Sequence, residues 1–220
     1  MFDRGARLFS VRLSRDGSSL VLSSPAVKGK TEVVTADFDG DRLSDFGVWH
    51  AGMWHTMLSS RQYGPDLTVF GIAGDVPVPA DYDGDSKADF AIFRPSENRW
   101  YIRSSESGTV RTFDLGIAGT DQLLPADYSG DGKADPAVYR GSSWHWINSE
   151  TGAEERFAFG FDDARPVPQD IDRDGSVDLV LFRNGTWYVY DGSRLASYKF
   201  GSDGDIPLGA VTVRSSLASR

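Results

Sequence analysis

The chain of 220 residues contains no cysteine, which excludes disulfide bonds and thiolate metal sites. It has only three histidines, His50, His55 and His145, and neither a GxSxG nor an HExxH motif. No apolar run is long enough to span a membrane, and no segment has the periodicity of an amphipathic helix. We therefore expect a protein of strands and turns that is not an enzyme. A carboxylate pair for glycoside hydrolysis is the catalytic alternative that stays open.

Basic residues are also scarce relative to acidic ones. The chain has 23 Lys and Arg against 32 Asp and Glu, a net charge of −9. Too few cations are available to neutralise a phosphate backbone, so nucleic acid is excluded as a partner. The start, MFDRGARLFSVRLSRDG, has no apolar core and is not a signal peptide. We expect a domain cut from a longer exported chain that works outside the cell or at its surface.

One acidic stretch occurs four times. In ADYDGDSKADF, residues 80–90, aspartates stand at positions 1, 3, 5 and 9 of a loop that begins at Asp81. The four loops span 37–45, 81–89, 127–135 and 170–178, and their first aspartates are 44, 46 and 43 residues apart. This spacing indicates one structural unit that has been copied.

Each unit contains four short apolar segments rich in Val, Ile, Phe, Tyr and Trp, separated by Gly, Pro, Asp and Ser, a pattern that indicates strands and turns. Four strands every 40 to 50 residues are typical of a propeller blade. Residues 7–17 resemble 99–108, and residues 205–213 resemble 75–82, with Val211 in place of the first loop aspartate. The sequence thus predicts one all-β domain over 7–214, a β-propeller of about five four-stranded blades. Its acidic loops would join the first two strands of each blade, and 205–213 would be a degenerate fifth unit.

The acidic loops have the composition of a calcium site. Calcium takes six to eight oxygen ligands, and alternating acids in a tight loop direct carboxylates inward. We expect up to four calcium ions, with a main-chain carbonyl from position 7 of each loop. The predicted ligands are Asp37, Asp39, Asp41, Leu43 and Asp45; Asp81, Asp83, Asp85, Lys87 and Asp89; Asp127, Ser129, Asp131, Lys133 and Asp135; and Asp170, Asp172, Asp174, Ser176 and Asp178.

The third loop should bind calcium more weakly than the first two, because neutral Ser129 replaces an aspartate. An EF-hand is excluded, since its position 12 requires a bidentate Glu and these loops have Val48, Ile92, Val138 or Leu181 there. Magnesium fits less well, because it keeps several waters and seldom uses a cage made only of protein ligands.

The D-x-D-G-D-x-x-x-D loops, the Phe-Gly pairs and the VPVPADYDGD lead-in resemble the FG-GAP/VCBS repeats. These are calcium-loop propeller repeats of integrin α chains and of many bacterial surface and secreted proteins. The resemblance covers about residues 7–214. It implies a propeller in which calcium has a structural role and the binding surfaces lie elsewhere. It also implies a non-catalytic, extracellular module for protein binding or adhesion.

A carbohydrate-binding module, attached to a polysaccharide-active enzyme or acting as a lectin, is the alternative. Tryptophans recur in one register at Trp54, Trp100, Trp144 and Trp187. Two interpretations of this register are packing between blades and stacking on sugar rings. Trp146 and Trp49 lie outside that register and are the better sugar-binding candidates. A basic residue also recurs after the second strand of each unit (His50, Arg94, Arg140 and Arg183), and we expect it to pair with a nearby carboxylate.

Overall fold

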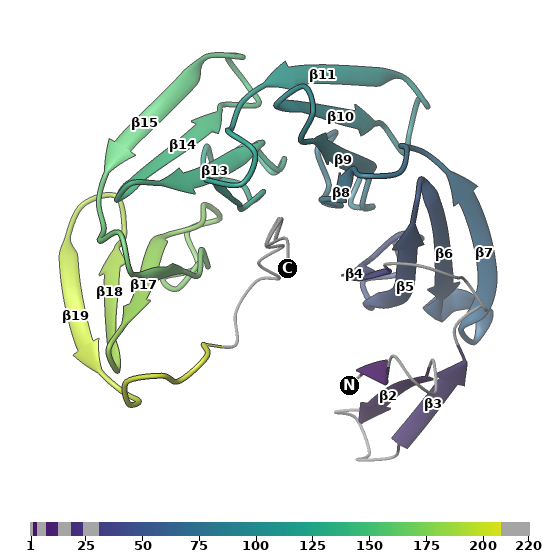
Figure 1. The fold of residues 1–220 in the computed structure, drawn as a ribbon, viewed down its shortest axis with the longest axis horizontal. Coiled ribbons are helices and arrows are strands. Elements are labelled where there is room, and N and C mark those ends of the chain that lie inside the picture. The colour runs from purple at the N-terminus through teal and green to yellow at the C-terminus, as the bar shows by residue number, and fades with distance from the viewer. Residues whose placement is uncertain (1, 4–7, 13–18, 24–30, 208–220) are drawn as a thin grey trace.

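The computed structural model describes residues 2–3, 8–12, 19–23 and 31–207, and these form antiparallel sheets arranged around a ring (Figure 1). The first blade consists of β4 (Glu32–Ala36), β5 (Asp45–His50), β6 (Met53–Leu58) and β7 (Gly64–Val69), with a short 3-10 helix η1 (Ser59–Arg61) before β7. The second consists of β8 (Val76–Pro77), β9 (Phe90–Arg94), β10 (Arg99–Arg103) and β11 (Val110–Asp114).

The other two blades repeat this order. The third contains β12 (Gln122–Leu123), β13 (Ala137–Arg140), β14 (Ser143–Ile147) and β15 (Glu154–Ala158). The fourth contains β16 (Arg165–Pro166), β17 (Leu179–Arg183), β18 (Thr186–Tyr190) and β19 (Leu195–Lys199). In every blade each strand pairs with the next one in sequence, so the blades are simple meanders. The chain is therefore an all-β β-propeller with four four-stranded blades.

The prediction of about five four-stranded blades is wrong in number. The N-terminal strands β1 (Phe2–Asp3), β2 (Leu8–Arg12) and β3 (Ser19–Ser23) form a three-stranded sheet, which we call the N-terminal sheet. Of the expected fifth unit at 205–213, residues 205–207 belong to no strand and the remainder lies outside the described residues. A first strand such as β8 is only two residues long and is held by its pairing with β9. Sequence similarity to such a segment is therefore not sufficient to predict a strand.

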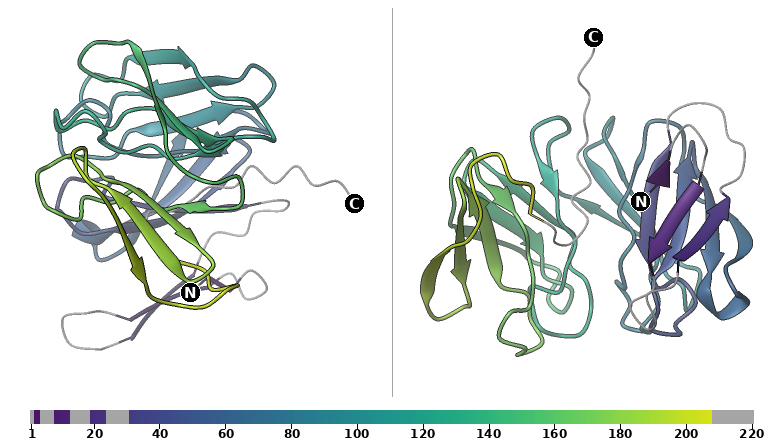
Figure 2. Two further views of the ribbon diagram at one scale, coloured as in Figure 1. Left: turned by 90° about the vertical axis from the view of Figure 1, so that its left-hand side faces the viewer. Right: turned by 90° about the horizontal axis from the view of Figure 1, so that it is seen from below.

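The core lies between blades. The side views in Figure 2 show the blades standing next to one another, with the N-terminal sheet beside the first blade. Trp54, Trp100 and Trp144 are at most 1% exposed. Around Trp54, residues of the second blade such as Ile92 and Phe90 complete the apolar cluster. Packing between blades, the architectural alternative for these aromatics, is what the structure shows at these three junctions.

A hydrogen bond explains why the tryptophans and the Phe-Gly or Leu-Gly pairs recur together. The Nε1 of Trp100 donates to the carbonyl oxygen of Leu115 at 3.0 Å, and the equivalent bonds join Trp54 to Phe70, Trp144 to Phe159 and Trp187 to Phe200. A buried indole N–H needs such an acceptor. The next residue is a glycine with positive φ, +102° at Gly116, a conformation that disfavours other residues.

No helix in the described part of the chain is long and apolar enough to cross a membrane.

The location of the core leads to a first prediction. Trp100→Ala should lower the free energy of unfolding by about 3–5 kcal/mol, the usual cost of emptying a buried aromatic position. Val110→Ala, on an exposed position of the same blade, should change it by no more than about 0.5 kcal/mol. Urea unfolding measures both values, and similar losses for the two variants would show that the core is not where the structure places it.

Candidate functional site

The four acidic loops connect the first two strands of their blades, as predicted. Each is folded by its first aspartate. The Oδ1 of Asp81 accepts the N–H of Gly84 at 2.6 Å, and its Oδ2 accepts the N–H of Ser86 at 2.8 Å. The same two bonds recur from Gly40 and Arg42 to Asp37, from Gly130 and Gly132 to Asp127, and from Arg173 and Gly175 to Asp170. Four loops of different sequence therefore share one backbone path.

The middle aspartates are fixed both by the loop and by serines outside it. In the second loop, Asp83 and Asp85 each accept one N–H from the loop through Oδ1. Their Oδ2 atoms accept the hydroxyl protons of Ser104 and Ser105, at 2.5 and 2.7 Å. Ser60 and Ser59 make the same bonds to Asp39 and Asp41 in the first loop. These hydroxyls orient the carboxylates in the way that outer partners orient metal ligands.

These serines were not predicted from the sequence. The available signal was the Ser-Ser pair that follows the tryptophan strand in the first two units, at 59–60 and 104–105. In the fourth unit the corresponding residues are Asp191 and Gly192.

The aspartate at position 9 ties each loop to its blade. Asp89 is fully buried, and its two oxygens accept the N–H groups of Tyr82 at 2.9 Å and Ser105 at 2.6 Å. Burial, against the lowering effect of those two hydrogen bonds and with a smaller contribution from the nearby carboxylates, raises the pKa of Asp89 to about 6. Asp45 and Asp135 are equally buried and make equivalent bonds. Asp178 accepts only one such bond, from Ile171.

Three of the four loops bring three carboxylates together. Ligand oxygens lie within 4.8 Å of one another in the sets Asp37, Asp39 and Asp41; Asp81, Asp83 and Asp85; and Asp170, Asp172 and Asp178. The third loop forms no such set among the described residues, because Ser129 occupies position 3 and its hydroxyl lies 3.2 Å from that of Ser149. The donors present in three loops are thus the hard oxygen ligands that calcium requires.

The structure does not place the remaining predicted ligands in a cluster of three carboxylates. Asp131 and Asp174 each accept the N–H two residues further along their loop, and neither belongs to a three-carboxylate set. The carbonyl ligands assigned to Leu43, Lys87, Lys133 and Ser176 stay predictions.

Neighbouring loops are joined by backbone hydrogen bonds. The N–H of Ala88 donates to the carbonyl of Asp37 at 2.6 Å, and the same bond runs from Ala134 to Asp81 and from Val177 to Asp127. Position 8 of each loop thus contacts position 1 of the loop before it. These backbone hydrogen bonds therefore connect the four loops in series across all three junctions between blades.

The close approach of the loops explains the glycine at position 4. A Cβ on Gly40 would lie 2.9 Å from the side chain of Lys87 in the next loop, and one on Gly84 would lie 3.2 Å from Lys133. Arg173 takes this position in the fourth loop with φ +66°. No later loop follows among the described residues, so a side chain is accommodated there.

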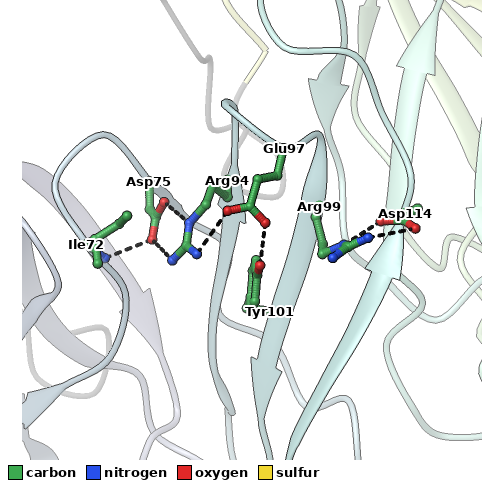
Figure 3. Close-up of polar contacts among 7 residues, drawn as sticks. All are labelled: Ile72, Asp75, Arg94, Glu97, Arg99, Tyr101 and Asp114. Atoms are coloured by element: carbon green, nitrogen blue, oxygen red, sulfur yellow. Dashed lines mark hydrogen bonds and ion pairs between the residues drawn. The ribbon is translucent and has the colours of Figure 1, made fainter.

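The arginines that end the second strands β9, β13 and β17 pair with carboxylates, as expected, and the expectation for His50 stays a prediction. Figure 3 shows Arg94 bound through Nε and Nη2 to both oxygens of Asp75, at 2.9 and 3.0 Å. These hydrogen bonds raise the pKa of Arg94, so its charge is permanent. Arg140 pairs with Asp121 at 3.1 Å and Arg183 with Asp163 at 2.7 Å. Each acid precedes the first strand of its blade, so the pair ties the linker between blades to the second strand.

The two tryptophans proposed as sugar-binding candidates lie within the packed structure. Trp49 is buried in the cluster that contains Trp54. Trp146 is half-buried, and its ring stacks on Tyr128 with centroids 5.4 Å apart. Trp49 is therefore not available to stack on a ligand, and one face of Trp146 is already occupied.

Comparisons with known proteins identify the fold class but no family. No family model matches the sequence, and no curated protein matches it. Among solved structures, the chain is similar to a catalytically inactive variant of virginiamycin B lyase from Staphylococcus aureus, with TM-score 0.58, 12% identity and 90% of this chain covered. It is also similar to an Agrocybe aegerita lectin that recognises terminal N-acetylglucosamine, with TM-score 0.56, 13% identity and 78% coverage.

A protein from Lactobacillus plantarum is a third neighbour, with TM-score 0.51, 14% identity and 83% of this chain covered. The chain spans 64%, 54% and 61% of the lengths of these three proteins. At such identities the likeness concerns the β-propeller fold alone.

The two bidentate pairs in Figure 3 provide a matched test of the linker contact. Arg94→Ala should destabilise the protein by about 3 kcal/mol, because it leaves the Asp75 carboxylate, whose side chain is 1% exposed, buried without its counter-charge. Arg99→Ala removes an equally well-formed pair with Asp114, but in solvent, and should cause no measurable loss. Equal losses in thermal unfolding would contradict a special role for the buried pair.

Proposed function

We propose that the protein is a calcium-binding, non-catalytic β-propeller that acts outside the cell as a protein-binding or adhesion module. The observation that supports it best is a cluster of three carboxylates in three loops that share a backbone path, at positions 1, 3 and 5 of the first two loops and at positions 1, 3 and 9 of the fourth. A single acidic turn has little value as evidence, since exposed acids are common without a metal. Recurrence in the equivalent loop of the first, second and fourth blades points to a common ligand.

The residues present fit calcium. Carboxylates at positions 1, 3 and 5 would supply most of the oxygens in the first two loops, and the serine hydroxyls would keep those side chains in place. When bound, calcium neutralises acids that otherwise repel one another. Because each loop is hydrogen-bonded to the next, ordering the loops would hold adjacent blades together. The proposed role of calcium is therefore structural.

Extracellular calcium, at roughly 1 mM, suits such a role. A site with a dissociation constant of about 10 μM would then stabilise the fold by about 2.7 kcal/mol through mass action. Removal of calcium with EDTA should lower the melting temperature substantially, and Asp83→Asn should reproduce part of this loss. Asp114→Asn, which changes an acid outside the loops, is the control. A melting curve that does not respond to EDTA after verified metal removal would rule out the structural role.

The third loop allows a gain of binding. Ser129→Asp would restore the acid that the other loops have at position 3 and should create a further calcium site of comparable affinity. Calorimetric titration of metal-free protein should then show an increase in the number of ions bound at low micromolar calcium. Thr112→Asp adds the same charge at an exposed position of β11, outside the loops, and serves as the control. An equal increase in both variants would mean that net charge, not loop position, determines binding.

Carbohydrate binding is the second candidate, favoured by one observation: the lectin among the fold neighbours, which recognises N-acetylglucosamine. Of the two tryptophans outside the repeated register, Trp146 is the one that retains an exposed part. A glycan array with calcium-loaded protein separates the two functions. Reproducible sugar binding that is lost in Trp146→Phe would favour the lectin, whereas an array without signal and capture of a defined protein partner would favour the protein-binding module.

A further inference from the structure

The two outer strands of the fourth blade, β18 and β19 in Figure 1, carry a pocket of about 420 Å³. Alternate residues of both strands line it, and successive residues of a strand point to opposite faces, so the pocket lies on one face of the sheet. Its apolar lining consists of Ile171, Trp187, Val189, Ala196, Tyr198 and Phe200. The volume falls within the range of roughly 300–1,000 Å³ that is usual for pockets that bind small molecules.

Trp187 lacks the aromatic cover that its counterparts receive from their own acidic loops. In the first three blades, an aromatic residue at loop position 2 belongs to the core around the tryptophan of the same blade. These pairs are Phe38 and Trp54, Tyr82 and Trp100, and Tyr128 and Trp144. Position 2 of the fourth loop is Ile171, which is 50% exposed. Since no blade follows the fourth in the described part of the chain, solvent reaches the half-buried indole of Trp187.

A second difference lies at Ala196, which pairs with Val189 across the two strands. The equivalent positions in the ladders of the first three blades hold longer, charged side chains, namely Asp66, Arg111 and Glu155. Arg111 reaches from β11 to its acidic loop, where Nη2 donates to the carbonyl oxygen of Tyr82 at 2.7 Å. The methyl group of Ala196 cannot span such a gap. The space between β19 and the fourth loop is therefore open.

The aromatic part of the pocket is a fixed platform. Trp187 and Tyr198 are partners across β18 and β19, and Phe200 follows on the same face. The indole is held by the hydrogen bond from its Nε1 to the carbonyl oxygen of Phe200 at 3.0 Å. Tyr198 and Phe200 are 56% and 77% exposed. Such a surface suits the C–H face of a pyranose ring, which packs on aromatic side chains.

Polar groups with unused hydrogen-bonding capacity lie at the other end of the same face. Asp191 accepts two hydrogen bonds from Ser193 and one from Arg194, all through Oδ1. Among the described residues, its Oδ2 accepts none and no carboxylate pairs with the guanidinium of Arg194. Both side chains line the pocket. One accepts and the other donates, which suits sugar hydroxyls because a hydroxyl does both.

The charges around the pocket favour a neutral sugar. Asp172 and Asp178 also line it, so with Asp191 three carboxylates oppose the one guanidinium of Arg194. The balance stays negative if a calcium ion is held by Asp170, Asp172 and Asp178, since four negative charges then oppose three positive ones. An acidic sugar would be repelled.

We propose that this pocket is a binding site for a neutral saccharide, whose ring lies on Trp187 and Tyr198 and whose hydroxyl groups bind Asp191 and Arg194. The inference rests on the carbohydrate-binding candidate and places its site on the fourth blade instead of at Trp146. It does not depend on calcium, whose role the melting curve in EDTA tests separately.

A glycan array probed with the full-length chain tests the ligand class. The array carries neutral oligosaccharides of glucose, galactose, mannose and N-acetylglucosamine, beside glycans that end in uronic or sialic acid. We expect reproducible binding to at least one neutral glycan. Binding confined to acidic glycans, or no binding at all, would overturn the proposal.

Two arginine variants test the position of the site. Ala196→Arg introduces the residue that the second blade has there and fills the pocket, so binding of the neutral glycans should weaken at least about tenfold. Ser197→Arg adds the same side chain on the opposite face of β19 and should leave binding unchanged. Equal losses in the two variants would overturn the proposal. Binding that persists in Ala196→Arg but is lost in Trp146→Phe would also overturn it, while supporting a lectin with its site at Trp146.

Tryptophan fluorescence keeps the test decisive if Ala196→Arg misfolds. A neutral glycan that binds on the array should reduce quenching by acrylamide in the wild-type protein, because it covers the indole of Trp187. In Trp187→Phe, with an unchanged melting temperature, the glycan should cause no such reduction. The same reduction in Trp187→Phe would place the sugar elsewhere and contradict the proposal.

Discussion

The structure depends on how a dense group of carboxylates is neutralised at one end of each blade. The loop between the first two strands holds three or four acids, and the hydrogen bonds that these acids accept from the described residues come from backbone N–H groups and serine hydroxyls. The aspartate at position 9 is fully satisfied in this way in the first three loops and can be buried. In the first two loops the acids at positions 1, 3 and 5 keep acceptor capacity turned toward one another, an arrangement that favours a divalent cation.

The same loops carry the connection between blades. A propeller has no sheet that crosses from one blade to the next, so cohesion comes from the apolar junctions and from the few polar contacts that bridge them. The backbone bond from Ala88 to Asp37 and its two counterparts are such contacts. The apolar junctions depend on the tryptophans, whose indole N–H groups are satisfied inside their own blade, so that the ring faces are free to pack against the next one.

Much of this arrangement could be predicted because it repeats. Four copies of one loop located the acidic sites between the first two strands, and the tryptophan register located the core. The serines were not predicted, because Ser104 and Ser105 act on carboxylates about twenty residues earlier and only the fold shows the two segments to be close. Trp49 was misjudged as an exposed platform, since its place outside the tryptophan register says nothing about which sheet face it occupies.

The blade number was wrong for a related reason. The segment at 205–213 resembles a first strand, but in three of the four blades this strand consists of two residues and exists only through its neighbour. Strand β1 is equally short and lies before the region in which sequence similarity could be recognised. Features that depend on pairing between distant ends of the chain leave little trace in a local pattern.

Native mass spectrometry of metal-stripped protein titrated with calcium tests the central claim most directly. The account predicts stepwise uptake of several calcium ions per chain at micromolar concentration, with at least one step lost in Asp83→Asn and none lost in Asp114→Asn. Absence of specific uptake, or uptake that is the same in both variants, would contradict it.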